Sequence, residues 1–153
     1  MESTTARSED GTPDELAPHI TTLVFPMEAW GKDEWVPVSV FATYSTATPY
    51  EVGLEFLVAG RSAAYWVFAR DLLLDGSVYA AGSGDVWVWT RAAADGRPER
   101  VHLLLDNGSE RCLFVADHRH AALWCAMMTS LVPRGEESRH LDLDGAVDRL
   151  LSG

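Results

Sequence analysis

The stretch WVFARDLLLDGSVYAAGSGDVWVW, residues 66–89, is the most informative part of this chain because its pattern predicts a strand, a short helix, a turn and a second strand in succession. Its ARDLLLDG part predicts one or two helical turns. We expect Leu72 and Leu73 to face inward and Gly76 to end the helix in the left-handed conformation. The glycine-rich segment that follows predicts a tight turn.

The strand that closes this stretch carries large apolar groups on both faces. Val86, Val88 and Thr90 alternate with Trp87 and Trp89 along it. Because both faces are apolar, we expect one of them to contact another protein chain.

Four strands are predicted before this stretch. They are expected at Ile20–Phe25, Val36–Tyr44, Val52–Val58 and Ala63–Phe68. A loop at residues 31–34 and turn residues at 45–49 and at Gly60 separate them. Consecutive strands joined in this way form a meander.

A hairpin is predicted after the stretch. Val101–Leu105 and Cys112–Ala116 flank Asn107 and Gly108, a dipeptide that favours the two positive φ angles of a type I′ turn. The second strand of this hairpin leads into a helical pattern.

Two helices are predicted near the C-terminus. The first begins after Asp117, a good N-cap, and ends before Pro133. Its apolar stripe consists of Ala121, Trp124, Met127, Met128 and Leu131. Asp144 can cap a last short helix that buries Val147, Leu150 and Leu151. The expected fold class is α+β, with two antiparallel β-sheet units of about seven strands, a short helix between them and C-terminal helices.

Composition limits the function classes. The chain has 153 residues, 23 of them acidic and 12 basic, and a formal net charge of −11. Such a chain repels polyanions, so binding to a nucleic-acid backbone is not expected. Residues 1–18 contain almost no large apolar side chains, which predicts a disordered acidic tail before one domain at residues 19–153.

The apolar runs of the sequence predict the localisation of the protein, and the residues around its cysteines predict their redox state. The first 18 residues lack the apolar core of a signal peptide, and no apolar run approaches the roughly 18 residues of a membrane-spanning helix. A soluble cytoplasmic protein is therefore expected. Cys112 and Cys125 lie among apolar residues, which predicts reduced, packed thiols.

No catalytic, cofactor-binding or metal-binding residues are expected. The turn at Gly82 and Gly84 opens a strand and lacks a third glycine, so it does not fit a dinucleotide fingerprint. On a helix, His118 and His120 would point about 200° apart, which predicts solvent-facing side chains and not a zinc site. No serine comes with a recognisable histidine and acid.

Five residues are candidates for a protein interface. Trp66 and Trp124 are interpreted as core, whereas the side chains of Trp87 and Trp89 have valines opposite them. Trp30 and Trp35 are expected in the loop between the first two strands. Arg70 is expected to pair with an acid of another strand, with a partner contact as the alternative. The candidates are Trp30, Trp35, Arg70, Trp87 and Trp89.

The central stretch also resembles the SsgA-like proteins of sporulating actinomycetes, in which WVFARDLL is followed by a glycine, a GxGDV element and a tryptophan. The resembling residues here are 66–73, then Gly76, Gly82, Gly84, Asp85, Val86 and Trp89. The likeness extends over roughly residues 20–151. Before the central stretch it includes VPV at 36–38, Tyr44 and Pro49-Tyr50, and after it VPxGxE at 132–137 and HLDLD at 140–144. Among these residues, the resemblance assigns structural roles to Trp66, Phe68, Asp71, Gly76, Gly82, Gly84 and Asp85.

The resemblance implies a fold and a function. It implies a Whirly-like fold, a homo-oligomeric state, expected to be a trimer, and control of septum placement and septal wall remodelling at the division or sporulation septum. At least one branch of the family helps to recruit FtsZ, so FtsZ or another SsgA-like protein is the expected partner. The chain departs from the family pattern at Ala80, Trp87, Thr90, Met127 and Met128.

The sequence thus leaves three function classes in competition. The preferred hypothesis is a non-enzymatic protein adaptor of cell division and sporulation. The second is a Whirly-like single-stranded nucleic-acid-binding protein, with exposed aromatic residues for base stacking and an opposing net charge. The third is an enzyme or ligand-binding protein for wall precursors, for which no assembled site is evident.

Overall fold

The computed structural model describes residues 17–77, 79–96 and 99–141, and within these residues eight strands form an antiparallel sheet. The elements are β1 (Ile20–Gly31), β2 (Glu34–Ser45), β3 (Glu51–Val58), β4 (Arg61–Ala69), α2 (Arg70–Gly76), β5 (Ala81–Ser83), β6 (Val86–Arg91), β7 (Arg100–Asp106), β8 (Arg111–Asp117), α3 (His118–Leu131) and the 3₁₀ helix η2 (Glu137–His140). Most of the predicted tail and the predicted final helix lie outside the described residues.

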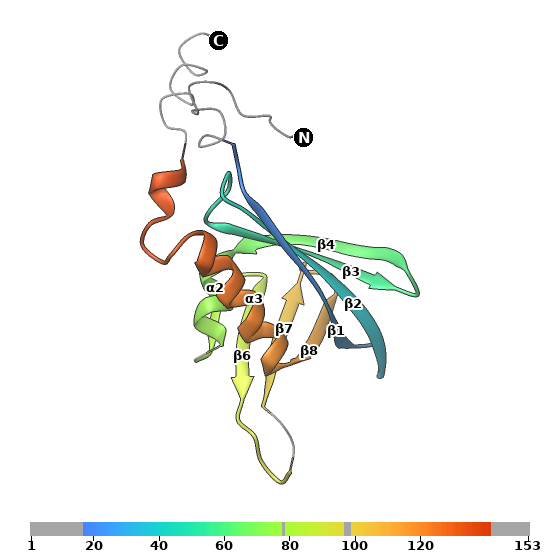
Figure 1. The fold of residues 1–153 in the computed structure, drawn as a ribbon. Helices are drawn as coiled ribbons and strands as arrows, with labels where there is room; N and C mark the ends of the chain where they lie inside the picture. The colour runs from blue at the N-terminus through green and yellow to red at the C-terminus, as the bar shows by residue number, and fades with distance from the viewer. Residues whose placement is uncertain (1–16, 78, 97–98, 142–153) are drawn as a thin grey trace, which may run out of the picture.

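The strand order is β4-β3-β2-β1-β8-β7-β6-β5. The predicted meander is present as β1–β4, and β5–β8 form a second meander. The prediction of two sheet units with about seven strands is wrong: the described residues form one sheet of eight strands, because Glu28–Trp30 of β1 pair with Leu113–Val115 of β8 and join the halves. The two halves cross at a steep angle, so the sheet curls around an interior (Figure 1).

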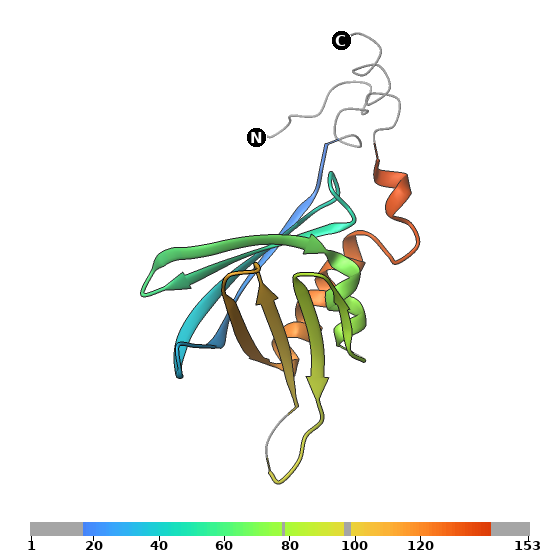
Figure 2. The ribbon, with the colours of Figure 1, turned by 180° about the vertical axis from the view of Figure 1, so that it is seen from behind.

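Helix α3 fills one part of this interior. Asp117 caps it by accepting a hydrogen bond of 2.8 Å from the backbone N–H of Arg119, as predicted. Its inward stripe buries Trp124 and Met128, and Pro133 follows its end. Because α3 lies on the inner side of β6–β8, the other side of these strands faces outward (Figure 2).

The inner faces of the two halves meet in one core. Phe56 of β3 stacks on Phe114 of β8 with ring centroids 4.1 Å apart. Alternate residues of β1 and β2, such as Met27 and Val40, are also buried. Period-two alternation therefore supplies one apolar face for the whole curled sheet.

Two turns differ from expectation. The hairpin between β7 and β8 is present, but only Gly108 of the predicted pair has positive φ, so the turn is not type I′. The Asn107 side chain instead accepts hydrogen bonds from the backbone N–H groups of Ser109 and Glu110, which stabilises a longer loop. Lys32 and Asp33 carry the paired positive φ angles, 54° and 64°, between β1 and β2.

The glycines of the central stretch are used for close packing. Gly76 does not have positive φ, contrary to the prediction; it is buried, and a Cβ there would overlap Val88 of β6. The predicted tight turn begins as the short strand β5, and Gly84 at φ 59° makes the turn into β6. Leu72 and Leu73 are partly buried against the core, whereas Leu74 is buried.

Candidate functional site

The four candidate tryptophans lie on the outer face of the sheet. Pairing places Trp87 of β6 beside Leu104, Leu104 beside Leu113, and Leu113 beside Trp30. Trp30 is in turn beside Trp35 of β2. Since residues paired across a ladder share a face, these side chains form one row across five strands. We call this row, with its neighbours Trp89 and His102, the tryptophan face.

Three of the four indoles of this face are exposed, whereas Trp89 is half-buried. Trp87 retains 46% of its accessible surface, Trp35 49% and Trp30 37%. Their exposure follows from alternation, because Val86 and Val88 occupy the inner side of β6 and are buried. An exposed aromatic row of this kind is typical of a surface that binds another protein.

Local contacts hold the indoles in place. The Trp30 and Trp35 rings lie 5.1 Å apart, and Trp89 stacks on His102 at 5.3 Å. Trp87 lies over Gly82 of the neighbouring strand, where a Cβ would overlap the ring. The expectation that Trp30 and Trp35 lie in a loop is wrong: they are a cross-strand pair, and the turn is only Lys32 and Asp33.

Arg70 is placed inside the molecule. Only 1% of it is exposed, and its Nη2 donates to Glu137 Oε2 at 2.8 Å. Its Nη1 donates to the Val132 carbonyl at 2.7 Å and to Tyr44 Oη at 3.1 Å. Arg70 therefore does not contribute to the exposed surface. The expected pairing with an acid is present, although this acid belongs to η2 and not to a strand.

The other residues with predicted structural roles lie around this centre. Phe68 is buried, and Trp66 is partly buried against the core. Asp71 is exposed and does not cap α2; its carboxylate lies 3.9 Å from Arg134. Asp85 is exposed, and its carbonyl accepts a hydrogen bond from the Asp106 N–H at the β6–β7 edge.

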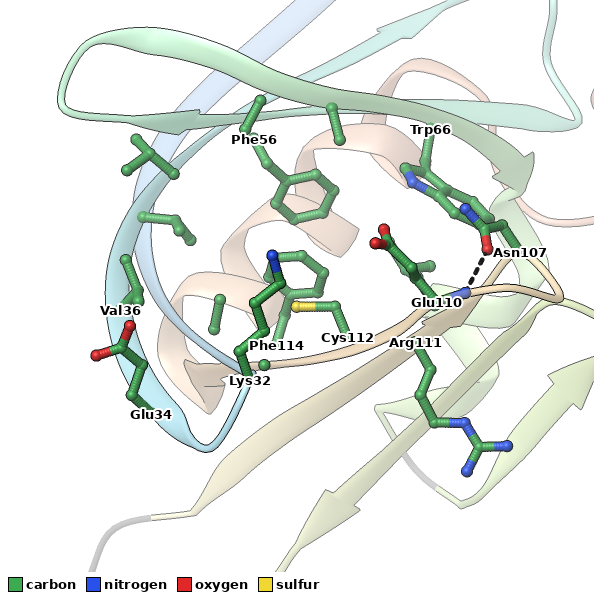
Figure 3. A pocket seen from close by; sticks show the side chains of 17 residues that line it. Lys32, Glu34, Val36, Phe56, Trp66, Asn107, Glu110, Arg111, Cys112 and Phe114 are labelled. Atoms are coloured by element: carbon green, nitrogen blue, oxygen red, sulfur yellow. Dashed lines mark hydrogen bonds between the residues drawn. The ribbon is translucent and has the colours of Figure 1, made fainter.

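An open cavity of about 670 Å³ lies on the inner side of the sheet (Figure 3). The hairpins β1–β2, β3–β4 and β7–β8 all contribute to its lining. Phe56, Phe114 and Trp66 form apolar walls, the Lys32 side chain points toward the cavity, and the Arg111 side chain extends away from it (Figure 3).

The cavity does not resemble an assembled catalytic site. Its charged lining residues, Lys32, Glu34, Glu110 and Arg111, come from turns and strand ends, and most of the remaining lining is apolar. Burial raises the pKa of the Cys112 thiol, which makes this cysteine a poor nucleophile. Within the described residues, no group of three or more histidines, cysteines or carboxylates is arranged to hold a metal ion.

The histidines differ from expectation. His118 and His120 were predicted to face solvent, but both are half-buried. His118 Nδ1 lies 3.5 Å from Glu99, and the His120 ring stacks on Phe25 at 6.0 Å.

Across the part of the chain that the structure covers, no helix is long and apolar enough to cross a membrane.

Comparison with known proteins identifies relatives over most of the chain. A family model described as "Streptomyces sporulation and cell division protein, SsgA" matches residues 38–137. The sporulation-specific cell division protein SsgB of Salinispora tropica is 38% identical over 120 residues, which cover 77% of this chain and 82% of that protein. SsgB of Saccharopolyspora erythraea is 38% identical over 136 residues, with 87% and 94% covered.

Solved structures give the same relationship. An SsgA-like sporulation-specific cell division protein from Thermobifida fusca superimposes with a TM-score of 0.75 at 26% identity, covering 86% of this chain and 95% of that one. A structure from work on SsgB mutations and longitudinal cell division in sporulating Streptomyces coelicolor gives a TM-score of 0.71 at 30% identity, with 80% and 96% covered.

Proposed function

The chain belongs to the SsgA family of sporulation and cell division proteins, and we propose that it acts there as a non-enzymatic adaptor for the septal machinery. It would bind other proteins at the division or sporulation septum, either to recruit FtsZ or to direct septal peptidoglycan remodelling. A role in sporulation cell division is supported by the names of its relatives.

The observation that carries the adaptor proposal is the tryptophan face. Trp87, Leu104, Leu113, Trp30 and Trp35 form a row in which the three indoles are exposed and the two leucines are half-buried. Among the described elements no helix covers this row, because α2 and α3 lie on the inner side (Figure 2). Aromatic side chains of this size dominate the binding energy of protein interfaces.

The charge of the protein determines how this surface would bind FtsZ. The formal net charge is −11, and FtsZ is expected to be acidic as well, so long-range attraction would be unfavourable. Binding would depend on apolar and directional short-range contacts. The affinity of the whole proteins should therefore change little with salt, or rise as salt screens the repulsion. A steep loss of affinity with added salt would contradict this proposal.

A homo-oligomer, expected to be a trimer, belongs to the same proposal. Copies of the chain and FtsZ could then compete for exposed apolar surface, so the oligomeric mass has to be measured alongside binding. Light scattering of the purified protein gives this mass.

The test is co-sedimentation with polymerised actinomycete FtsZ. The full chain should pellet with the filaments, and the Trp87→Ser and Trp35→Ser variants should pellet less. Tyr50→Ser is a matched control, because Tyr50 is 48% exposed and lies in the turn between β2 and β3, away from the tryptophan face. An intact oligomer that stays in the supernatant would refute FtsZ recruitment and leave septal wall-remodelling proteins as partners.

A Whirly-like single-stranded nucleic-acid-binding protein is the second candidate. The exposed indoles favour it because bases stack on aromatic rings, whereas the net charge opposes it. Fluorescence anisotropy with a labelled oligonucleotide at low salt tests it. Saturable binding would support this candidate, and a flat titration would eliminate it.

A further inference from the structure

Two arginines face each other at one end of the tryptophan face. Arg91 of β6 and Arg100 of β7 are direct cross-strand partners, and both are exposed. Like charges in directly opposite positions destabilise a sheet. Their presence in a chain with a net charge of −11 is therefore a feature that the fold itself does not require.

Nearby acids neutralise this pair only in part. Within the described residues, the ion pair of Arg100 is a loose contact of 3.7 Å with the exposed Glu28, and Arg91 has no ion pair. Asp117, the other neighbour of Arg100 across the ladder, is bound by Arg119 at 2.8 Å. The two guanidinium groups thus leave donors free for an incoming anion.

The arginine pair is next to the indoles. Trp89 of β6 and His102 of β7 are the next cross-strand pair on the same face, two residues from Arg91 and Arg100 along their strands. Trp87 lies two residues before Trp89 on β6. Burial lowers the pKa of His102 most, and the charge of Arg91 lowers it further; a hydrogen bond with the Arg100 backbone raises it, and the Arg100 charge has the smallest, lowering effect. The charges of both arginines therefore act on an imidazole of the same face.

We propose that Arg91, Arg100, Trp89 and Trp87 bind a short extended acidic segment of a partner protein, with carboxylates on the arginines and apolar side chains against the indoles. This inference rests on the proposed adaptor function, because it assigns a partner chemistry to the same face. It adds a directional contact that an acidic protein needs to bind another acidic protein.

The strand geometry predicts the pattern of this segment. Residues two apart on β6 are about 6.6 Å apart along the strand, which is also the spacing of alternate residues in an extended peptide. A segment lying along β6 would therefore place an acid at Arg91, an apolar residue two positions later at Trp89 and another at Trp87. The expected pattern is acid-x-apolar-x-apolar.

The same observations favour a peptide over a nucleic acid. Strong binding to a phosphate backbone requires many cations along a track. Here two arginines are bordered by the acids Glu28, Glu99 and Asp117. A short segment can contact the arginines while remaining outside the range of most other acids, since screening limits repulsion to roughly 8 Å at physiological salt.

Fluorescence anisotropy with synthetic peptides tests the proposal. The probe is a fluorescein-labelled peptide containing Glu-Glu-Ser-Leu-Ser-Phe, and its counterpart has both glutamates replaced by glutamine. The full chain should bind the acidic peptide about tenfold more tightly, as expected when the glutamate two positions before the leucine forms exposed ion pairs with both arginines. The double variant Arg91→Gln/Arg100→Gln should bind both peptides equally.

Two controls make the result specific. Arg61→Gln removes one exposed arginine at the start of β4, and Arg61→Gln/Arg139→Gln matches the charge change of the double variant. Both should keep the tenfold preference. In NMR, the acidic peptide should raise the pKa of His102, because bound carboxylates oppose the arginine charges. Equal affinity of the wild type for both peptides, or tighter binding of a single-stranded oligonucleotide, would overturn the proposal.

The outcome is separable from that of the adaptor proposal. If FtsZ filaments pellet the Arg91→Gln/Arg100→Gln variant as well as wild type while Trp87→Ser is lost, the adaptor function stands and the acidic-segment proposal fails. If the peptide preference is present but FtsZ does not bind, the acidic segment belongs to another septal protein.

Discussion

Replacing Arg70 should destabilise the protein more than replacing any exposed arginine. The guanidinium is buried and connects three separate parts of the chain, through Tyr44, Val132 and Glu137. Arg70→Met keeps a side chain of similar length but leaves the Glu137 carboxylate buried without its cation. Breaking a buried ion pair in this way costs about 3–5 kcal/mol.

This cost is large relative to the total stability, which is about 5–15 kcal/mol for a domain. At roughly 2–4 °C per kcal/mol for a chain of this size, it corresponds to a fall in Tm on the order of 10 °C. Urea unfolding followed by tryptophan fluorescence measures the free energy directly. All variants are compared at one protein concentration, because oligomerisation shifts apparent stability.

The double variant Arg70→Met/Glu137→Leu separates the causes. It removes the orphaned carboxylate, so it should be at least about 1 kcal/mol more stable than Arg70→Met. Arg134→Met is the control: Arg134 pairs with Asp75 at 2.7 Å, but its side chain is 48% exposed, so the loss should be below about 1 kcal/mol. If Arg70→Met costs no more than the control, or if the double variant costs the sum of its single variants, the reasoning is refuted.

Three further predictions concern other parts of the structure. Gly76→Ala should lower the free energy of unfolding by about 1–3 kcal/mol, because the added Cβ would overlap Val88. Adding Val88→Ala should recover part of this loss. An unchanged urea midpoint of Gly76→Ala would contradict the close packing. Burial raises the pKa of Cys125 to about 11, so in a Cys112→Ser background Ellman's reagent at pH 8 should react only after unfolding, and rapid reaction of the folded protein would contradict this. Hydrogen bonds from its own backbone N–H and from Arg70 hold the pKa of Glu137 below its ordinary value of 4.5. The ionised carboxylate therefore stabilises the fold above pH 4.5, and this contribution is lost as the pH falls through the lower pKa of the folded state. Urea midpoints measured from pH 6 downward should decline, and Glu137→Gln should reduce this decline.

Local features of the sequence were sufficient for most of the secondary structure. Alternating apolar residues predicted β2, β3 and β4, and Asp117 with the apolar stripe through Trp124 and Met128 predicted α3. These predictions are confirmed because periodicity and capping act within a few residues. The turn chemistry was less secure, since Asn107 used its side chain to build a longer loop.

Burial in the folded protein distinguishes arginine and tryptophan side chains with an internal role from those that lie on the surface. In the sequence, Arg70 could pair internally or contact a partner, and only its position beside Glu137, 67 residues away, shows that it is buried. Trp124 is core because α3 packs inside the sheet, whereas Trp87 lies outside. Such differences depend on which elements cover a residue, not on its neighbours in the chain.

The family, the strand-rich α+β character and the alternation that directs Trp87 and Trp89 away from the core can all be derived from the amino-acid sequence. The pairing of β1 with β8, which joins the two halves and brings Trp30 and Trp35 into one row with Trp87, is visible only in the folded protein. The tertiary structure also places Arg91 opposite Arg100 beside that row. The physical reason is that alternation sets a side chain's direction locally, whereas register between distant strands is set by packing across the whole interior.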